Sequence, residues 1–491
     1  MTTTTTLAPI EVPELPDTDL AEVKPIRGRF EKEGVFNVLR NFYDEAQIKA
    51  MQEQGVDSRM VFGINSYYMA LVKGEGLQDS NGNVILPPMA PSESLTHLVV
   101  PIVAEAVDKS GEKDPSNQIR YSPDELKGKI LHKYDEIVLG YAAMACSAHC
   151  RYCYRLDLFN GSTGKGLVKP EELRAYVTNY NQDLAKRGGV DENGDKRWPI
   201  TEVLLSGGDV MVLNNKQLYK YLAASAAAGV DVIRIGTKEM AFRPMRFDTN
   251  FAETLRIFHK NYPNTLINIV THFSHPDEML ERDEHGNYRK ENGHHVLLKP
   301  VAEAIQNMGS LDFVSMDNQT PIIRDVNDNS DDLHLLHREL RRAGISFKYI
   351  FQCREIEGHK AFAVPLETAW RIHNEAQKGL SDASRSRFAM STEWGKLEVT
   401  SVTSSDQTEI AQRVQEMSPA NALFGEGLVI MKIHRSPFAA HSQGDVVIAR
   451  GNPKALWISD YEDRIIYDGR RQPASEDAQE AADRAEAAEA A

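Results

Sequence analysis

The middle of the chain alternates short apolar runs with longer segments in which apolar residues recur at helical spacing. Runs that are apolar throughout are typical of strands buried on both faces, and helices between them imply right-handed crossovers and a parallel sheet. The predicted strands are residues 137–144, 203–205, 232–235, 266–270, 313–316 and 347–351. The predicted helices are residues 171–184, 216–228, 252–259, 301–308 and 333–343. The fold class is therefore α/β, with six βα units that suit an incomplete TIM-like barrel.

The segments around this core differ in pattern. Residues 26–129 show helical spacing up to about residue 73 and then an irregular stretch with one helix near residues 101–107, which predicts an N-terminal helical region. A polar insertion, residues 281–295, is expected to lie on the surface. Residues 361–472 combine a helix at 366–377 with shorter β-like runs at 428–433, 446–449 and 464–467, which predicts a small C-terminal α/β region after a core at 130–360.

Both ends of the chain lack an apolar period. Residues 1–25 carry a threonine run and prolines, and residues 473–491 are rich in Ala, Glu and Asp. We expect a flexible leader and an acidic, disordered tail.

Composition limits the kinds of partner. The 491 residues carry 71 acidic and 56 basic side chains, a net charge of −15, which argues against nucleic acid or an anionic membrane as the main partner. No apolar run approaches the length of about 18 residues that a membrane span requires, and the start of the chain has no signal-peptide pattern. We therefore expect a cytoplasmic protein that binds a small molecule.

Three of the four cysteines fall within eight positions at the end of the first predicted strand: Cys146, Cys150 and Cys153, in the pattern CxxxCxxC. Cysteine thiolates hold iron–sulfur clusters. Three ligands on a [4Fe–4S] cubane would leave one iron open to a small molecule. Two other interpretations are a zinc site that lacks a ligand and a chance group of buried thiols, since Cys353 is 200 residues away.

Several further motifs follow the cysteines in order. They are residues 63–72, 204–209, 234–237, 271–276, 318–328 and 349–353. Together with CxxxCxxC, these motifs resemble those of radical S-adenosylmethionine (SAM) enzymes of the lysine 2,3-aminomutase family. The resemblance covers roughly residues 30 to 400. The resemblance implies that the barrel is of the radical SAM type. It also implies a 5′-deoxyadenosyl radical, generated by one electron from the cluster, that removes a substrate hydrogen.

The resemblance also implies cofactor contacts at the ends of strands. Ser206, Gly207, Gly208 and Asp209 match the motif that meets the methionine amino group of SAM, and His272 and Gln319 match positions near the cofactor. Taken alone, GGD usually marks a turn, and His or Gln at a strand end is a common structural feature. An external one-electron reductant of the flavodoxin or ferredoxin type and a homodimer or larger assembly are implied as partners.

Lysine 2,3-aminomutases also bind pyridoxal phosphate through a lysine imine. Lys396 matches the imine position, and Lys133 matches an arginine that contacts the phosphate. Ser391, Thr392, Glu393 and Trp394 replace the glycines that precede the lysine in the family. Lys396 could instead be a surface lysine in a β-turn.

The predicted substrate contacts depart from lysine-specific members. Arg155 matches the arginine that binds the substrate carboxylate. Arg354 stands where those members have the aspartate that binds the distal ammonium of lysine. Their second acidic residue that contacts this ammonium would fall near Ala389, which is uncharged. A buried ammonium facing a cation is unfavourable, so an acidic or neutral polar side chain suits this pocket better than lysine. Alternatively, Arg354 pairs with Glu355 or Glu357 and faces away.

Three functions remain open from the sequence. The first is a SAM-dependent amino migration on a carboxylate-bearing amino acid, with pyridoxal phosphate. The second is a radical SAM reaction that does not use pyridoxal phosphate, such as a rearrangement, an epimerisation or an elimination. The third is a non-catalytic metal-binding protein.

Overall fold

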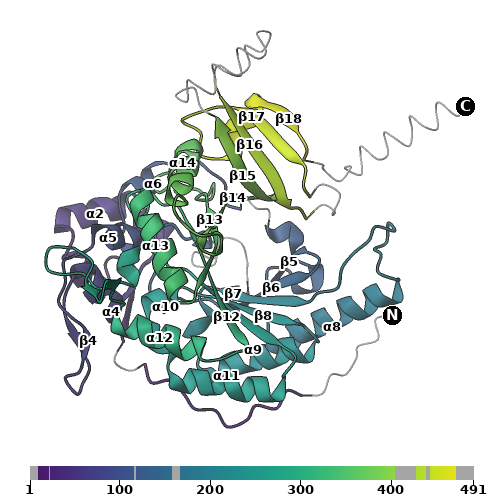
Figure 1. The fold of residues 1–491 in the computed structure, drawn as a ribbon, viewed down its shortest axis with the longest axis horizontal. Helices are drawn as coiled ribbons and strands as arrows, with labels where there is room; N and C mark the ends of the chain where they lie inside the picture. Colours follow the sequence, from purple (N-terminus) through teal and green to yellow (C-terminus); the bar gives the residue numbers. More distant parts are fainter. Residues whose placement is uncertain are drawn as a thin grey trace, which may run out of the picture.

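One twelve-stranded mixed sheet organises the fold. The structure is a computed structural model, and it describes residues 9–20, 23–114, 118–156, 166–403, 427–437 and 443–470. The strand order of the sheet is β18-β17-β16-β15-β14-β13-β12-β9-β8-β7-β6-β5. The strands from β6 to β14 run parallel to their neighbours, and the strands at both ends run antiparallel. The architecture is therefore a mixed α/β fold with a largely parallel central sheet (Figure 1).

All six predicted strands are confirmed, in the predicted order and parallel. They are β6 (Ile137–Ala143), β7 (Glu202–Gly207), β8 (Val232–Gly236), β9 (Leu266–Thr271), β12 (Val314–Pro321) and β13 (Ser346–Phe351). The predicted helices between them are α8 (Pro170–Lys186), α9 (Asn215–Ala227), α11 (Thr249–Asn261), α12 (Lys299–Gly309) and α13 (Ser330–Arg342). Figure 1 shows α9, α11 and α12 packed together along one face of the sheet.

Local sequence explains where these helices begin and which face they bury. Asn214 caps α9 by accepting a hydrogen bond from the Gln217 N–H, and Asp248 caps α11 in the same way. In α13, Leu333, Leu336 and Leu340 recur at helical spacing and are fully buried, which fixes the helix against β13.

The C-terminal region, predicted as a small α/β region, contains a helix and strands, and its strands join the central sheet. The predicted helix is present as α14 (Leu366–Ala376), and the predicted β runs are β16 (Leu428–Arg435), β17 (Val446–Arg450) and β18 (Ile465–Asp468). However, β14 (Arg387–Thr392) pairs with β13, and β15 (Gly395–Thr403) pairs with β14, so these strands extend the central sheet. The pattern of apolar residues did not predict β14 and β15.

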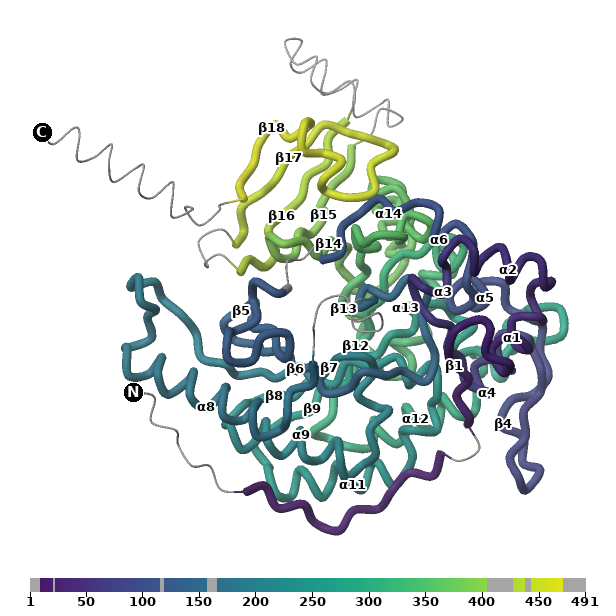
Figure 2. Tube along the Cα trace, turned by 180° about the vertical axis from the view of Figure 1, so that it is seen from behind, coloured from purple at the N-terminus to yellow at the C-terminus, as the bar shows by residue number. Residues whose placement is uncertain are grey.

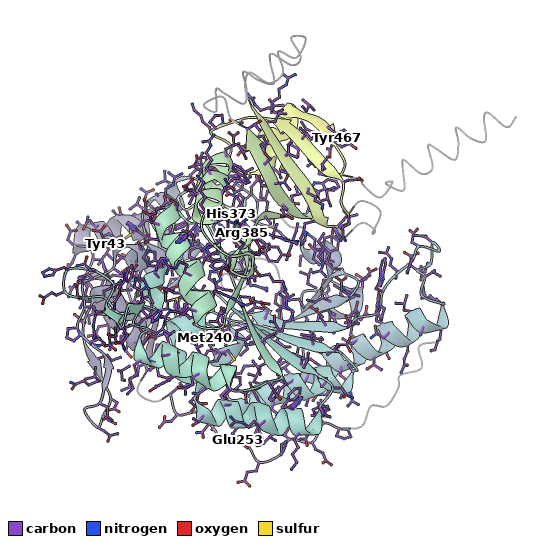
Figure 3. The ribbon with its side chains drawn as sticks, viewed as in Figure 1. Tyr43, Met240, Glu253, His373, Arg385 and Tyr467 are labelled. Atoms are coloured by element: carbon purple, nitrogen blue, oxygen red, sulfur yellow. The ribbon has the colours of Figure 1, made fainter. Side chains whose placement is uncertain are left out.

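The outer strand β18 lies at one edge of this sheet. Tyr467 on β18 is 53% exposed, at the opposite end of the molecule from Glu253 on α11 (Figure 3). The other edge is β5 (Ile130–Tyr134), which pairs antiparallel with β6. Residues 473–491, the predicted acidic tail, lie outside the described residues.

The N-terminal region is helical, as predicted. Its helices are α1 (Glu33–Leu39), α2 (Glu45–Glu53), α3 (Val56–Arg59), α4 (Ser66–Lys73), α5 (Glu93–Val99) and α6 (Ala104–Val107). It also contains a strand pair that was not predicted, β1 (Pro25–Gly28) with β2 (Phe62–Asn65), and a short pair of β3 (Leu77–Gln78) with β4 (Val84–Leu86). This region packs beside the sheet (Figure 2), and Arg151 in the loop after β6 donates a hydrogen bond to its Met60 carbonyl.

Residues 9–20, within the predicted flexible leader, contain no helix or strand but are held against the core. Ile10, Val12 and Leu15 pack on the hydrophobic core, and the Asn215 side chain donates to the Pro16 carbonyl at 2.7 Å. Figure 2 shows this segment running beneath α11. Short apolar anchors fix this segment, which the polar composition did not predict.

The polar insertion forms a short hairpin, β10 (Lys290–Glu291) with β11 (His294–His295). Its tip is mostly exposed, as predicted, whereas Glu281 and Arg282 at its base are buried. Within the described part of the chain, no helix has the length and apolar character needed to span a membrane.

Candidate active site

A cavity of about 340 Å³ lies at the carboxyl ends of the parallel strands. Residues from strands β5 to β15 and from the loop after β6 line it, so the sheet must curve around this space. Ligand sites of parallel sheets occur at this edge. All residues that the sequence analysis singled out line the cavity: Cys146, Cys150, Cys153, Arg155, Ser206, Gly207, Gly208, Asp209, His272, Gln319, Lys133, Arg354 and Lys396.

The three clustered cysteines share one loop, directly after β6, and none forms a disulfide. Burial raises the pKa of Cys150 to about 12 and also raises the pKa of Cys146, where Asp209 and Cys153 add to the effect. Such thiols lose their protons when a metal centre supplies positive charge. In the described residues, no three His, Cys, Asp or Glu side chains are arranged to hold a single metal ion. In a cubane, each thiolate binds a different iron.

A buried ion cluster fixes this loop from the N-terminal region. Glu105 on α6 accepts two hydrogen bonds from Arg151, at 3.1 and 2.8 Å, and one from Arg59 at 2.5 Å. Glu105 and Arg151 are fully buried. Arg151 lies between Cys150 and Cys153 and also donates to the Met60 carbonyl at 3.0 Å. The N-terminal region therefore positions the cysteines, a role that sequence reasoning missed.

The glycines of the GGD motif have a structural role beside any contact with a ligand. A Cβ on Gly207 would lie 2.1 Å from the Ala143 carbonyl oxygen, and one on Gly208 would lie 2.4 Å from that of Ala145. Gly207 also has φ +125°, which disfavours other residues. These glycines let the end of β7 pack directly on the backbone that leads to Cys146.

Asp209 braces the next loop. Its buried carboxylate accepts hydrogen bonds from the Thr237 hydroxyl at 2.8 Å and from the Lys238 N–H at 2.6 Å. Burial and the nearby Glu239 raise the pKa of Asp209. The side chain therefore ties the ends of β7 and β8 together at the wall of the cavity.

Lys238 was missed by the sequence analysis. It lines the cavity, and its Nζ donates to Glu278 at 2.7 Å and to the His272 carbonyl at 2.7 Å. Nε2 of His272 lies 3.0 Å from the Tyr152 hydroxyl. Burial, and next Lys238, hold the pKa of His272 well below its ordinary value, so the ring is neutral. The one sequence signal was the position of Lys238, directly after the motif at residues 234–237.

The other half of the cavity is cationic. Lys396 lies on β15 beside Arg435, Arg234, Arg354 and Lys133, all of which line the same space. Burial and then the charges of Arg435 and Arg234 lower the pKa of Lys396 to about 7. Its Nζ lies 4.5 Å from the centre of the Tyr349 ring.

The alternative interpretation of Lys396 as a surface lysine in a turn is wrong. The turn between β14 and β15 precedes it, and Lys396 pairs with Ser391 within the sheet. Lys133 donates from Nζ to the Thr392 carbonyl at 2.7 Å, and burial followed by Arg354 lowers its pKa to about 7. Thr392, one of the residues at the positions of the glycines in lysine 2,3-aminomutases, is thus held next to Lys133.

Arg155 and Arg354 lie on the ring of Tyr154, at 4.9 and 4.6 Å from its centre. Nη1 of Arg155 is buried and has no hydrogen-bond partner in the described structure, although the residue lines the cavity. Arg354 also faces the cavity, and Glu355 instead accepts a hydrogen bond from Ser459. The interpretation in which Arg354 faces away is therefore wrong. Ala389 is buried in β14.

Comparisons with known proteins find relatives that are named as aminomutases. A protein of Aquifex aeolicus (strain VF5), provisionally named an L-lysine 2,3-aminomutase, is 25% identical over 414 residues, which cover 84% of this chain and 90% of the relative. The chain is similar to several proteins of the lysine 2,3-aminomutase family, at identities that make it a divergent relative. The glutamate 2,3-aminomutase of Clostridioides difficile (strain 630) is 23% identical, over 65% of this chain and 62% of its own.

A third member of the family is the L-lysine 2,3-aminomutase of Bacillus subtilis (strain 168), which is 27% identical over 53% of this chain and 46% of its own. No family model matches the chain. These relatives are aminomutases, which are isomerases, and the chain is an enzyme of this kind.

Proposed function

We propose that this enzyme is a radical SAM aminomutase that acts on an amino acid with an acidic or neutral polar side chain. The observation that carries the proposal is one cavity whose wall holds both the three cysteines and a low-pKa lysine among cations. The curved sheet would then be a partial (βα)6 barrel of the radical SAM type. Its strand ends would hold the cofactors.

The cysteine end fits a [4Fe–4S] cluster. Cys146, Cys150 and Cys153 would hold it through soft thiolate ligands on a loop that Glu105 fixes. When bound, the cluster supplies the electron that cleaves SAM. Ser206 to Asp209, His272 and Gln319 would surround SAM, since they line the same cavity as the cysteines. The chain's own work here is to position the ligand and exclude water.

The cationic end fits pyridoxal phosphate. A lysine with a pKa of about 7 is largely neutral at physiological pH and can act as a nucleophile toward an aldehyde. Lys133, whose pKa also falls to about 7, would be held protonated by the charge of the phosphate and would bind it as a point charge. When bound, pyridoxal phosphate supplies a ring that stabilises a migrating amine as a radical. Lys396 would hold that ring in the cavity and orient it toward the cysteine end.

Two arginines support the substrate class. Arg155 has a buried, unsatisfied donor in the cavity, which suits a carboxylate. Arg354 places a second guanidinium nearby, so a substrate with a second anionic or a neutral polar group would be favoured. The ammonium of lysine would be repelled. The relative named as a glutamate 2,3-aminomutase makes glutamate a natural first candidate.

The decisive experiment uses anaerobically reconstituted enzyme with dithionite, SAM and one of three deuterated amino acids: glutamate, aspartate or lysine. We expect deuterium in 5′-deoxyadenosine with an acidic substrate and little with lysine. The variant Arg354→Gln should lose this transfer while it keeps its iron content. Label transfer from lysine alone would contradict the proposed substrate class.

Two further measurements separate the remaining alternatives. Borohydride treatment of the enzyme with pyridoxal phosphate, followed by peptide mapping, should modify Lys396. Absence of that modification together with intact SAM cleavage would support a reaction without pyridoxal phosphate. Zinc without acid-labile sulfide in the purified protein would end the radical proposal.

A further inference from the structure

Tyr154 is a cavity residue that the sequence analysis did not single out. It directly follows Cys153 and lines the main cavity, and the residue is 38% exposed. Two cations lie against its ring: the guanidinium carbons of Arg155 and Arg354 are 4.9 and 4.6 Å from the ring centre. Arg155 also forms a hydrogen bond with the Tyr154 side chain. One phenol therefore contacts both arginines that are proposed to bind the substrate.

The two arginines come from separate parts of the fold. Arg155 belongs to the loop after β6, and Arg354 follows the end of β13 by three residues. Four strands lie between β6 and β13 in the sheet. Only the curvature of the sheet brings these two guanidiniums to one ring, so Tyr154 connects two separate parts of the cavity wall.

The charges of the two arginines act on each other. Arg155 is buried, and its Nη1 has no hydrogen-bond partner in the described structure. Burial lowers the pKa of Arg354 most, Tyr154 opposes this effect, and the charge of Arg155 lowers the pKa further. The acid Asp114 raises this pKa, but by less than any of these effects. A ligand therefore gains most if it brings an anionic group to each guanidinium.

An aromatic ring suits this position better than a carboxylate would. A carboxylate would accept hydrogen bonds from the guanidinium N–H groups and occupy the donors that a ligand needs. A ring attracts a cation through its π electrons and does not neutralise it. The side chain of tyrosine is also rigid, with only two rotatable χ angles. Tyr154 can thus fix the spacing of the two guanidiniums while most of their donors stay available to the cavity.

We propose that Tyr154 is a positioning residue that holds Arg155 and Arg354 at a fixed spacing for the two carboxylates of a dicarboxylic α-amino acid. Arg155 would bind the α-carboxylate, and Arg354 would bind the side-chain carboxylate. This inference rests on the proposed function and narrows its substrate class, since an uncharged polar side chain would bring no anion to Arg354.

The test compares two dicarboxylic amino acids, glutamate and aspartate, with their amides, glutamine and asparagine. Isothermal titration calorimetry measures their binding to the reconstituted enzyme without a reductant, so that no turnover occurs. We expect the acid of the better-fitting length to bind about tenfold more tightly than its amide, because the amide removes one charge-assisted pair.

The variants at position 154 separate the ring from the hydroxyl. In Tyr154→Leu, the preference for the acid should fall to about twofold, because both guanidiniums lose the ring that orients them. Tyr154→Phe keeps the ring and loses only the hydroxyl, so it should retain most of the preference. Tyr154→Met is a second variant without a ring, and iron and sulfide per chain should be equal in all three.

Trp198→Leu is the matched control. Trp198 is 39% exposed, its ring centre lies 5.3 Å from Nζ of Lys196, and it is not among the described residues that line the cavity. This variant therefore loses an exposed ring that contacts a cation elsewhere, and it should keep the full preference for the acid.

Several results would overturn the inference. They are equal affinity for acid and amide in the unmodified enzyme, a preference that survives in Tyr154→Leu or Tyr154→Met, and an equal loss in Trp198→Leu. Loss of iron in both variants without a ring would assign Tyr154 to the support of the cysteine loop and would also overturn it. The proposed function fails separately, if the unmodified enzyme with SAM and dithionite transfers no deuterium from any amino acid to 5′-deoxyadenosine.

Discussion

The titration of Lys396 is the property on which pyridoxal phosphate binding depends most directly. Its pKa falls from the ordinary 10.5 to about 7. At pH 7, about half of the amines are then neutral, against about 0.03% for an ordinary lysine, so the reactive fraction rises roughly 1,500-fold. Because burial is the largest cause and Arg435 the second, the variant Arg435→Gln should raise this pKa only part of the way.

The assay labels the protein with limiting acetic anhydride from pH 5.5 to 11, without pyridoxal phosphate, and follows Lys396 by mass spectrometry. We expect a midpoint near 7 in the unmodified enzyme and a higher one in Arg435→Gln. Lys432→Gln is the matched control, since Lys432 is an exposed cation on β16, the strand of Arg435, and is not among the main causes of the low pKa of Lys396. A midpoint near 10 in the unmodified enzyme would refute the assignment of Lys396 as a buried nucleophile.

The same shift affects stability. Between about pH 7 and 10.5, the unfolded chain holds a proton on Lys396 that the folded chain has lost. The unfolded state therefore binds more protons, and the contribution of this lysine to the free energy of unfolding rises with pH across that window. Below the folded pKa, this contribution stays at its least favourable value. Lys133, with a pKa also near 7, acts in the same direction.

Three further variants test the cysteine loop. Glu105→Gln leaves two buried guanidiniums without a counter-charge and should lower the free energy of unfolding by about 3–5 kcal/mol, measured by urea titration; no loss would contradict the buried ion cluster. Gly208→Ala forces a Cβ onto the Ala145 carbonyl and should reduce iron and sulfide per chain, whereas Gly34→Ala, which has room, should not. Cys150→Ala should lose the brown chromophore and SAM cleavage, and retention of both would disprove the ligand assignment.

Much of the core could be predicted from the sequence because its signals are local. A strand buried on both faces needs a continuous apolar run, and a crossover helix needs one apolar face. The strands β6, β7, β8, β9, β12 and β13 and the helices α8, α9, α11, α12 and α13 were therefore predicted correctly. The cysteine motif was also visible, since its spacing fixes three thiols on one loop.

Other features depend on contacts between residues far apart in the chain. Glu105 looked like an ordinary helical acid, and only the fold places it under Arg151. Lys396 gained its low pKa first from burial and then from arginines on β16, β8 and the loop after β13. Lys238 faces the cavity because β8 and β9 end together. Sequence determined which elements form and which residue types reach their ends. The tertiary structure alone decided which charges meet, because electrostatic effects depend on burial and distance in space and not on separation along the chain.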